Sequence, residues 1–203
     1  NSLGLDSCFE DLDNPIELFK KWFSKAEEKE INDPNAVAIA TSDKHNQPNV
    51  RMVLLKNLSD RGFVFYTNFN SKKGGELKIN LKASMCFHWK SLRRQVRVIG
   101  KVEEVTSKEA DDYYNSRPYK NRISAWASSQ SQILDKRETF LNKIKEYEKK
   151  YPDENNVPRP THWSGWRLLP DEIEFWVDGE GRIHERLNYK NSNGKWKKEI
   201  LYP

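Results

Sequence analysis

The feature that most constrains the fold is a series of short strand-like runs separated by turn-forming residues. Runs rich in Val, Ile, Phe, Tyr and Trp are followed within a few positions by Gly, Pro, Asn or Asp. Parallel strands need a crossover of a dozen or more residues, and most of these connections are shorter. The chain is therefore predicted to form an antiparallel sheet. The predicted strands are 36–41, 50–56, 62–68, 83–90, 95–105, 166–169, 173–177, 183–189 and 196–201, with a hairpin turn over 191–194.

Helical segments interrupt this pattern. The first is predicted to start at Pro15 behind an Asn14 cap, because Ile16 and Phe19 then recur at helical spacing. The predicted helices run from Pro15 to before Asp33, from Ser71 to Asn80, over 107–128 and over 135–151. These elements favour a mainly β (α+β) fold: a closed or nearly closed β-barrel with helices packed outside. We expect one domain over 14–203, because the strands after the Pro-rich loop make too small a sheet to stand alone, and a poorly ordered tail over 1–13.

Composition excludes several classes of protein. The 203 residues contain no run of 18 apolar residues and no charged-then-apolar leader, so neither a membrane span nor export is predicted. Cys8 and Cys86 form no CxxC pair, which favours a reducing, cytoplasmic location. Four scattered His and two Cys do not form a metal-binding pattern, so no metal site is expected. The net charge of +5 is compatible with a nucleic-acid surface or with pockets for small anions.

The sequence contains none of the common phosphate-loop, serine-hydrolase or zinc motifs. Instead, basic and hydroxyl residues stand at the ends of the predicted strands. Tyr66-Thr67-Asn68 ends one strand, and Ser71-Lys72-Lys73 opens the next helix. A helix N-terminus with two lysines is a plausible phosphate cradle, although an exposed lysine pair would show the same pattern. Arg51 and Lys56 similarly end one apolar strand, which is also common in ordinary strands.

Three further groups share this basic and aromatic character. Arg93, Arg94 and Arg97 lie within five positions of one strand. Residues 113–131 mix arginines with aromatic side chains, and residues 174–176 precede the basic run 182–186. Arginine stacks on flat rings and grips phosphate with two hydrogen bonds, so these groups could hold a planar anionic ligand.

Together these groups resemble one family. The segments RMVLLK, FYTNFNSKKG, RRQVRVIGKVE, YYNSRP, ISAWASSQS, IEFW and RIHER occur in the order and approximate spacing of the pyridoxamine/pyridoxine 5′-phosphate oxidases. The resemblance extends from about Asn14 to Pro203. It implies an FMN-binding split β-barrel that works as a homodimer with flavin at the subunit interface. It also implies oxidation of pyridoxine or pyridoxamine 5′-phosphate to pyridoxal 5′-phosphate, with hydride passing from C4′ to flavin N5, O₂ as acceptor and H₂O₂ as product.

The same resemblance implies roles for individual residues. FMN would be bound by Arg51, Met52, Val53, Leu54, Leu55, Lys56, Tyr66, Thr67, Lys72, Lys73, Gln95, Gln130, Ser131, Trp176 and Arg186. The substrate would be bound by Lys56, Tyr113, Arg117, Asn121, Arg182, Ile183, His184 and Asp33. Arg182 and His184 would cover the substrate ring and are the candidate catalytic residues.

The chain departs from the family pattern at several positions. Lys72, Asn121, Ser124, Ile183, Glu185 and Ile200 stand where Arg, Ser, Gly, Leu, Asp and Arg are usual. Two alternatives therefore stay open: an oxidase of another planar substrate, such as a phenazine precursor, or a binding module for flavin, heme or RNA. Arg117, Arg182 and His184 favour the B6 phosphate oxidase, because they suit a phosphate and a pyridine ring. Neither nucleic acid nor membrane is an expected partner.

Overall fold

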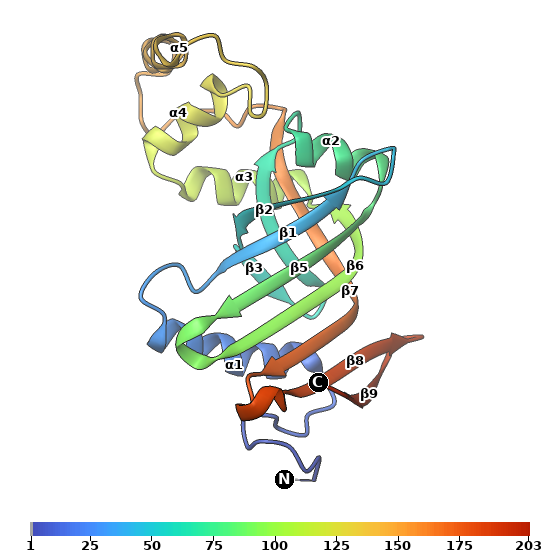
Figure 1. Ribbon diagram of the computed structural model, residues 1–203. Coiled ribbons are helices and arrows are strands. Elements are labelled where there is room, and N and C mark those ends of the chain that lie inside the picture. The colour runs from blue at the N-terminus through green and yellow to red at the C-terminus, as the bar shows by residue number, and fades with distance from the viewer. Residues whose placement is uncertain (1) are drawn as a thin grey trace.

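The computed structural model describes residues 2–203, and the strands of this part form a single antiparallel sheet (Figure 1). Neighbouring strands follow the order β2-β1-β5-β6-β7-β4-β3, while β8 pairs with β7 and β9 with β8. The backbone N–H of Lys56 donates to Val64 O (2.8 Å) and draws the end of β2 toward β4. The sheet therefore curls into an incompletely closed barrel, which confirms the predicted fold class. The strands are β1 (Ala36–Ser42), β2 (Pro48–Leu54), β3 (Asn57–Ser59), β4 (Gly62–Asn68), β5 (Lys82–Trp89), β6 (Arg94–Glu104), β7 (Trp163–Val177), β8 (Glu185–Ser192) and β9 (Lys195–Leu201).

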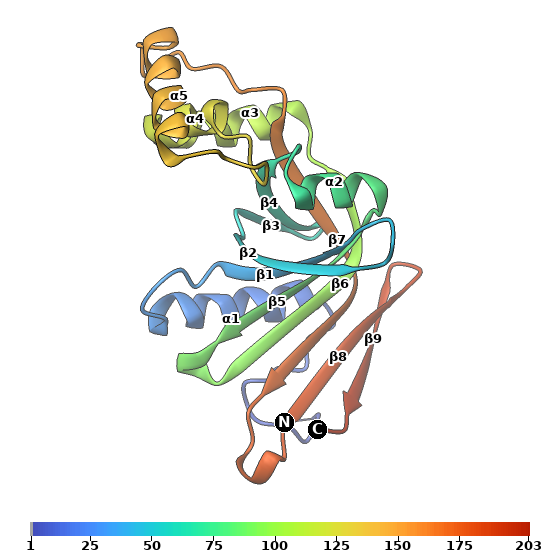
Figure 2. The same cartoon turned by 45° about the horizontal axis from the view of Figure 1, so that its top comes forward.

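Helices flank this sheet on two sides. Within residues 2–203 they are α1 (Pro15–Lys29), α2 (Lys72–Ile79), α3 (Ser107–Ser116), α4 (Tyr119–Ala127) and α5 (Arg137–Lys150), with short 3₁₀ turns η1 (Lys90–Leu92) and η2 (Glu180–Arg182). Helix α1 lies against the sheet, whereas α3, α4 and α5 gather beyond its far end (Figure 2). Asn14 caps α1 through its side-chain oxygen, as its position before Pro15 predicts.

The main core lies between α1 and the sheet. Phe19 packs edge-on against Phe63 and Phe87 at centroid distances of 5.0 and 4.9 Å. Trp22 meets Phe175 at 5.1 Å in the same way. All five rings are almost completely buried, so the apolar stripe of α1 fixes this helix on the inner face of the sheet.

The central strand β7 differs from the sequence prediction. Residues 166–169 and 173–177 are predicted as two strands, but Trp163–Val177 is one continuous strand. Its pairing with β6 shifts register between Ile99 and Gly100, opposite Pro170. A bulge at this point lets a proline, which has no N–H to donate, lie inside a strand without ending it.

Three other element boundaries also need correction. The helical stretch over 107–128 is two helices, because Pro118 supplies no backbone donor and holds an extended conformation between α3 and α4. The short strand β3 lies between the predicted strands 50–56 and 62–68, where no strand is predicted. Strand β8 begins at Glu185 rather than Ile183, because Gly181 and Arg182 take left-handed backbone conformations (φ 65° and 67°).

The segment before α1 does not form the loose tail that the sequence predicts. Phe9 is fully buried and meets Trp22 edge-on at 5.4 Å. The Trp22 indole donates to Cys8 O (2.8 Å), and the Tyr189 hydroxyl donates to Leu12 O (2.8 Å). These contacts tie the N-terminal segment to both α1 and β8.

The face of the sheet opposite α1 carries exposed apolar side chains. Val50, Met52 and Leu54 of β2 are 69%, 62% and 38% exposed. They alternate with residues that point inward, as the strand periodicity requires. An apolar strip of this kind is typical of a surface that another protein molecule covers. Among the described residues, no helix combines the length and apolar character needed to cross a membrane.

Candidate functional site

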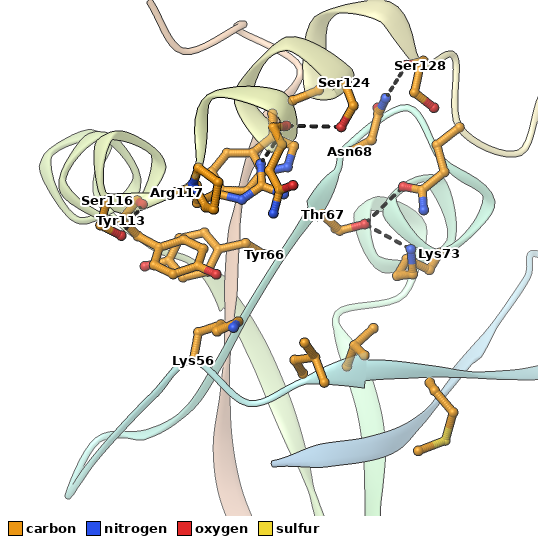
Figure 3. Close-up of a pocket in the computed structure, with 18 residues that line it drawn as sticks. Lys56, Tyr66, Thr67, Asn68, Lys73, Tyr113, Ser116, Arg117, Ser124 and Ser128 are labelled. Atoms are coloured by element: carbon orange, nitrogen blue, oxygen red, sulfur yellow. Dashed lines mark hydrogen bonds between the residues drawn. The ribbon is translucent and has the colours of Figure 1, made fainter. Parts of the chain in front are cut away.

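A cavity of about 590 Å³ lies between the ends of β2 and β4 and the helices α2, α3 and α4 (Figure 3). Strand ends on one side and helix termini on the other supply its polar groups. Eleven of the predicted site residues line it: Met52, Val53, Leu54, Lys56, Tyr66, Thr67, Lys73, Tyr113, Arg117, Asn121 and Gln130. The segments RMVLLK, FYTNFNSKKG, YYNSRP and ISAWASSQS thus meet at one place, although they are far apart in sequence.

Lys73 is the most unusual group of this cavity. Its side chain is 6% exposed, and its ammonium donates to Thr67 Oγ1 (2.8 Å). Gln130 Oε1 lies 3.4 Å from the same hydroxyl. Burial, reinforced by the nearby Arg51 charge, lowers the pKa of Lys73 to about 8. Within residues 2–203 no carboxylate forms a salt bridge with this ammonium, so the site holds a buried cation without a counter-ion.

The start of α2 adds backbone donors beside Lys73. Ser71 caps the helix by accepting from Gly74 N (3.2 Å). A Cβ on Gly74 would lie 2.4 Å from Phe69 O, so only glycine permits this close approach of helix and preceding turn. An anion bound at this point would therefore be attracted both by the positive end of the α2 dipole and by the ammonium of Lys73.

Arg51 lies beside this cradle rather than in the cavity wall. Its guanidinium binds Glu76 Oε1 (3.2 Å) and Thr41 Oγ1 (2.5 Å). Glu76 is 4% exposed and also accepts from Thr41 (2.8 Å) and Asn49 (2.7 Å). The predicted flavin residues Lys72 and Ser131 are exposed and Leu55 is buried; none of the three lines the cavity.

Aromatic rings and two further cations form the opposite wall. Tyr66 stacks on Tyr113 (centroids 4.2 Å apart, 21° between planes) and on Trp163 (5.4 Å, 10°). The Lys56 ammonium lies 5.7 Å from the Tyr113 ring, and the Arg117 guanidinium lies 4.7 Å from the Trp163 ring. Burial lowers the pKa of Arg117. Its NH1 donates to Asn121 O (3.3 Å), which leaves other N–H groups of its fork for a ligand.

The remaining predicted residues lie at the other end of the sheet (Figure 1). Gln95 of β6 pairs with Trp176 of β7, which pairs with Arg186 of β8. Paired residues share a face, so these three side chains form a row, here called the ladder. Arg186 makes two hydrogen bonds to buried Glu174 (2.8 and 3.0 Å), and this contact raises the pKa of Arg186.

The η2 turn places the two candidate catalytic residues next to the ladder. His184 packs on Trp176 with ring centroids 4.8 Å apart. Arg182 is exposed and has a left-handed backbone, and Ile183 is 73% exposed. Asp33, also left-handed (φ 41°) and exposed, lies in the loop between α1 and β1 and does not line the cavity.

One chain cannot bring the ladder to its own cavity. Following the pairings across the sheet places the exposed residues of β2 and the ladder on the same face. Trp163 at the start of β7 lines the cavity, but Trp176 lies 13 residues further along this continuous strand, which is about 40 Å at the usual rise per residue. The structure therefore divides the predicted site into two groups on one face of the sheet.

The predicted site residues leave out several members of both groups, although Asn68 and Glu174 belong to segments singled out in the sequence. Trp163 stacks in the cavity wall, and Asn68 holds the loop after α4 through Ser128 O (3.1 Å). Glu76 and Glu174, the partners of Arg51 and Arg186, were also missed. The segment HWSGW could have indicated Trp163, because it places two tryptophans close together. No local pattern indicates the two carboxylates, because their arginine partners are remote in sequence.

Comparison with known families gives two matches that together span most of the chain. The model described as pyridoxamine 5′-phosphate oxidase matches residues 23–151. The model described as the pyridoxine 5′-phosphate oxidase C-terminal dimerisation region matches residues 163–203. The first match contains the cavity segments other than Trp163, and the second contains most of the ladder and the η2 turn.

Individual relatives agree with these matches. The chain is 60% identical to a pyridoxine/pyridoxamine 5′-phosphate oxidase of Pelagibacter ubique, covering all of this chain and 98% of that protein. It is 52% identical to the corresponding protein of Agrobacterium fabrum, over 98% of each. Among solved structures, PhzG of Burkholderia lata, determined with tetrahydrophenazine-1-carboxylic acid, superimposes with a TM-score of 0.91 at 29% identity, covering 98% of this chain and 97% of PhzG.

Proposed function

The chain belongs to the pyridoxamine/pyridoxine 5′-phosphate oxidase family, and we propose on this basis that its cavity binds FMN and the substrate phosphate. The protein is an oxidase that converts pyridoxine 5′-phosphate and pyridoxamine 5′-phosphate to pyridoxal 5′-phosphate. Its C-terminal dimerisation region indicates a homodimer. The further assignments below concern the individual residues, the flavin and its position.

Buried, unpaired Lys73 is the observation that carries the FMN assignment. A buried ammonium without a carboxylate is unfavourable unless an anion joins it. Thr67 and the start of α2 supply neutral donors around the same point. These groups fit a phosphate dianion, with Arg51 beside them as a further positive charge. Lys72 and Ser131, exposed near the same end of the cavity, remain proposed contacts.

The second cluster of cations suits the substrate phosphate. The two cations are Lys56 and Arg117, which lie with Tyr113 on the aromatic side of the cavity, away from Lys73 (Figure 3). Asn121 lines the same wall and can donate through its side-chain amide in place of a hydroxyl. Two separate cation clusters in one cavity fit a flavin phosphate and a substrate phosphate. They do not favour a phosphate-free phenazine precursor as the substrate.

We place the flavin ring between two subunits. The cavity opens beside Met52 and Leu54, which line it and also belong to the exposed apolar strip of β2. A second subunit that covers this strip could bring its own ladder to the cavity. Gln95, Trp176 and Arg186 would then line the flavin, and Arg182, Ile183 and His184 would cover the substrate ring. Asp33 stays a proposed substrate contact.

Bound FMN supplies the hydride acceptor and the reaction with O₂ that releases H₂O₂. The protein residues would hold the substrate in place. Arg117 and Lys56 would bind the phosphate, and Arg182 would hold the ring by stacking and hydrogen bonding. His184 would orient the ring or move a proton at C4′, two roles that a pH profile separates. The two cysteines are free thiols, as expected in the reducing cytoplasm where we place the protein.

The proposed chemistry is tested by spectroscopy of the purified protein. It should be yellow, with one FMN per chain, and its visible absorbance should bleach when pyridoxine 5′-phosphate is added without oxygen. Readmitting O₂ should restore the colour and release H₂O₂ and pyridoxal 5′-phosphate. A colourless protein that takes up no added FMN, or a flavin that is not reduced by this substrate, would contradict the proposal.

The shared site is tested by mixing two impaired variants and measuring activity at a substrate concentration well below the wild-type KM. Arg117→Ala damages the cavity and Arg182→Ala damages the η2 turn. If each site combines the cavity of one chain with the turn of its partner, a mixed dimer contains one intact site. Equal refolding of the two variants should therefore restore about a quarter of wild-type activity, because half of the dimers are mixed and each has one working site of two. No recovery despite proven mixed dimers would show that each site is built from one chain.

A further inference from the structure

The loop between β7 and β8 brings two groups to the same nitrogen of His184. The backbone N–H of Gly179 donates to His184 Nδ1 (3.1 Å). Asp178 Oδ1 lies 3.1 Å from the same atom. An imidazole nitrogen accepts from an N–H only when it is deprotonated, and it donates to a carboxylate only when it is protonated. The two contacts therefore need different hydrogen placements on the ring, because Nδ1 is bare in the first and carries a hydrogen in the second.

The other nitrogen behaves differently. When Nδ1 accepts from Gly179, the neutral ring must carry its hydrogen on Nε2. When Nδ1 carries a hydrogen and donates to Asp178, the ring is either the neutral Nδ1–H tautomer, with a bare Nε2, or the imidazolium, with a hydrogen on each nitrogen. A carboxylate at Nδ1 disfavours the form in which Nδ1 is bare, and its negative charge stabilises the imidazolium.

Asp178 is itself held in place by Arg93. Nε and NH2 of Arg93 both donate to Asp178 Oδ2, the first at 2.9 Å, and the backbone N–H of Asp178 donates to Arg93 O (3.0 Å). The hydrogen bond from Arg93 lowers the pKa of Asp178, so this carboxylate is ionised at neutral pH. Its two oxygens are divided between Arg93 and His184.

Packing limits the ring to this position. The side chain of His184 is 11% exposed and lies against Trp176. A Cβ on Gly179 would lie 1.8 Å from Ile183 O, so the backbone of the turn that carries the ring is tightly closed. The charged groups near it are Asp178 at the end of β7, Arg93 after η1 and Arg182 in η2; Glu185 of β8 is engaged by the backbone N–H of Asp6.

We propose that Asp178 is a positioning residue that favours the protonated form of His184 through Nδ1, and that Arg93 limits this effect by sharing the carboxylate. The proposal rests on the proposed function, in which His184 faces the substrate ring. It gives Asp178 no contact with substrate. Its effect is on the charge of the ring and on which of the two hydrogen bonds, to Gly179 or to Asp178, holds that ring.

The test follows the ring of His184 by NMR against pH in the FMN-loaded protein. The chain has four histidines, so His184→Asn identifies the signal. Asp178→Asn should move the titration midpoint of this signal down by about one pH unit, because a favourable negative charge is lost. Arg93→Gln should move it up, because the carboxylate is freed from its competitor. Glu180→Gln, which removes an exposed carboxylate from the same turn, is the matched control and should leave the midpoint unchanged.

Two shifts of opposite sign would support the proposal, and the acid limb of the pH profile of kcat/KM should move with the midpoint in each variant. An unchanged midpoint in Asp178→Asn, or an equal shift in Glu180→Gln, would overturn it. The NMR measurement needs no substrate. Failure to oxidise pyridoxine 5′-phosphate would therefore contradict the proposed function alone, whereas an active oxidase with an unmoved midpoint would contradict only the role of Asp178.

Discussion

The ammonium of Lys73 donates to Thr67 Oγ1 at 2.8 Å in the floor of the cavity and has no carboxylate partner among residues 2–203. Three elements produce this arrangement. Thr67 is the penultimate residue of β4, the cap of α2 follows a few residues later at Ser71, and Arg51 forms its salt bridge with Glu76. The cradle is thus prepared for an anion before any ligand arrives.

Replacing this lysine should weaken flavin binding more than turnover. Lys73→Ala removes a charge-assisted contact that contributes about 1.5–3 kcal/mol, so the Kd of FMN should rise about 10- to 150-fold. Fluorescence titration of FMN measures this change, and kcat at saturating FMN should fall much less. Lys78→Ala, on the exposed side of the same helix, is the control. Equal Kd values for both variants and wild type would mean that Lys73 does not contact the phosphate.

Flavin binding should also depend on pH above neutrality. Because burial lowers the pKa of Lys73 to about 8, the free protein loses this charge as pH rises through 8. A phosphate dianion binds the charged form, so affinity is greatest below pH 8 and falls above it. Between pH 7 and pH 9 the Kd should rise about tenfold. Lys73→Arg keeps its charge over this range, so its Kd should stay nearly constant; an identical slope in this variant would place the titrating group elsewhere.

Substrate affinity should depend on Arg117 separately from flavin affinity. Arg117→Ala should raise KM for pyridoxine 5′-phosphate about 10- to 100-fold, because a charged donor to phosphate is lost. Arg117→Lys should recover only part of the lost substrate affinity, since lysine lacks the two-pronged guanidinium fork. The Kd of FMN should be unchanged in both, and Lys120→Ala on α4 serves as the exposed control. A changed FMN Kd with an unchanged KM would assign Arg117 to the flavin instead.

Variants of the η2 turn should affect catalysis with little loss of flavin. Arg182→Ala should lower kcat/KM by up to about a hundredfold, because the substrate ring loses its alignment. The kcat/KM of Arg182→Lys should lie between those of Arg182→Ala and the wild type. His184→Asn should be mild if the ring only orients the substrate, and severe, with loss of a limb in the pH profile, if it moves protons. Wild-type kinetics for all three variants would remove both residues from the site.

The tight closure of the same turn makes a stability prediction. In Gly179→Ala the new Cβ would lie 1.8 Å from Ile183 O, so the backbone of the turn must move. Unfolding free energy should fall by about 1–3 kcal/mol, as in other overpacked sites, and kcat/KM should fall with it. Gly75→Ala has nothing within 4 Å of the added Cβ and is the control. Thermal unfolding that is identical for both variants would show that the turn adapts without cost.

Local signals predicted much of the fold. The Asn14-Pro15 pair marks the start of α1 correctly, and Ser71 marks the cap of α2. The continuity of β7 could not be predicted, because Pro170 is tolerated only through a bulge in the pairing of β7 with β6. The burial of Phe9 likewise depends on a partner, Trp22, that a loose tail would not reach.

The candidate site divides in the same way. Family segments predicted which residues line the cavity, including Thr67 and Lys73. They could not predict that Arg51 is turned toward Glu76, because that contact depends on how α2 lies against the end of β1. Nor could they show that Trp176 lies at the far end of β7 from the cavity of its own chain, since that separation depends on β7 being one continuous strand.

The position of β7 has a consequence for biosynthesis. This strand is synthesised late, yet it pairs with β4 on one side and β6 on the other. Phe63 of β4 therefore gains its partner Leu168, and Val96 of β6 its partner Phe175, only after β7 has been made. A nascent chain that has left the ribosome only as far as α5 therefore exposes two unpaired strand edges. Contacts between such distant segments form slowly, and open edges are where partly made chains associate with one another. Premature termination before Trp163 would leave an aggregation-prone fragment rather than a smaller folded protein.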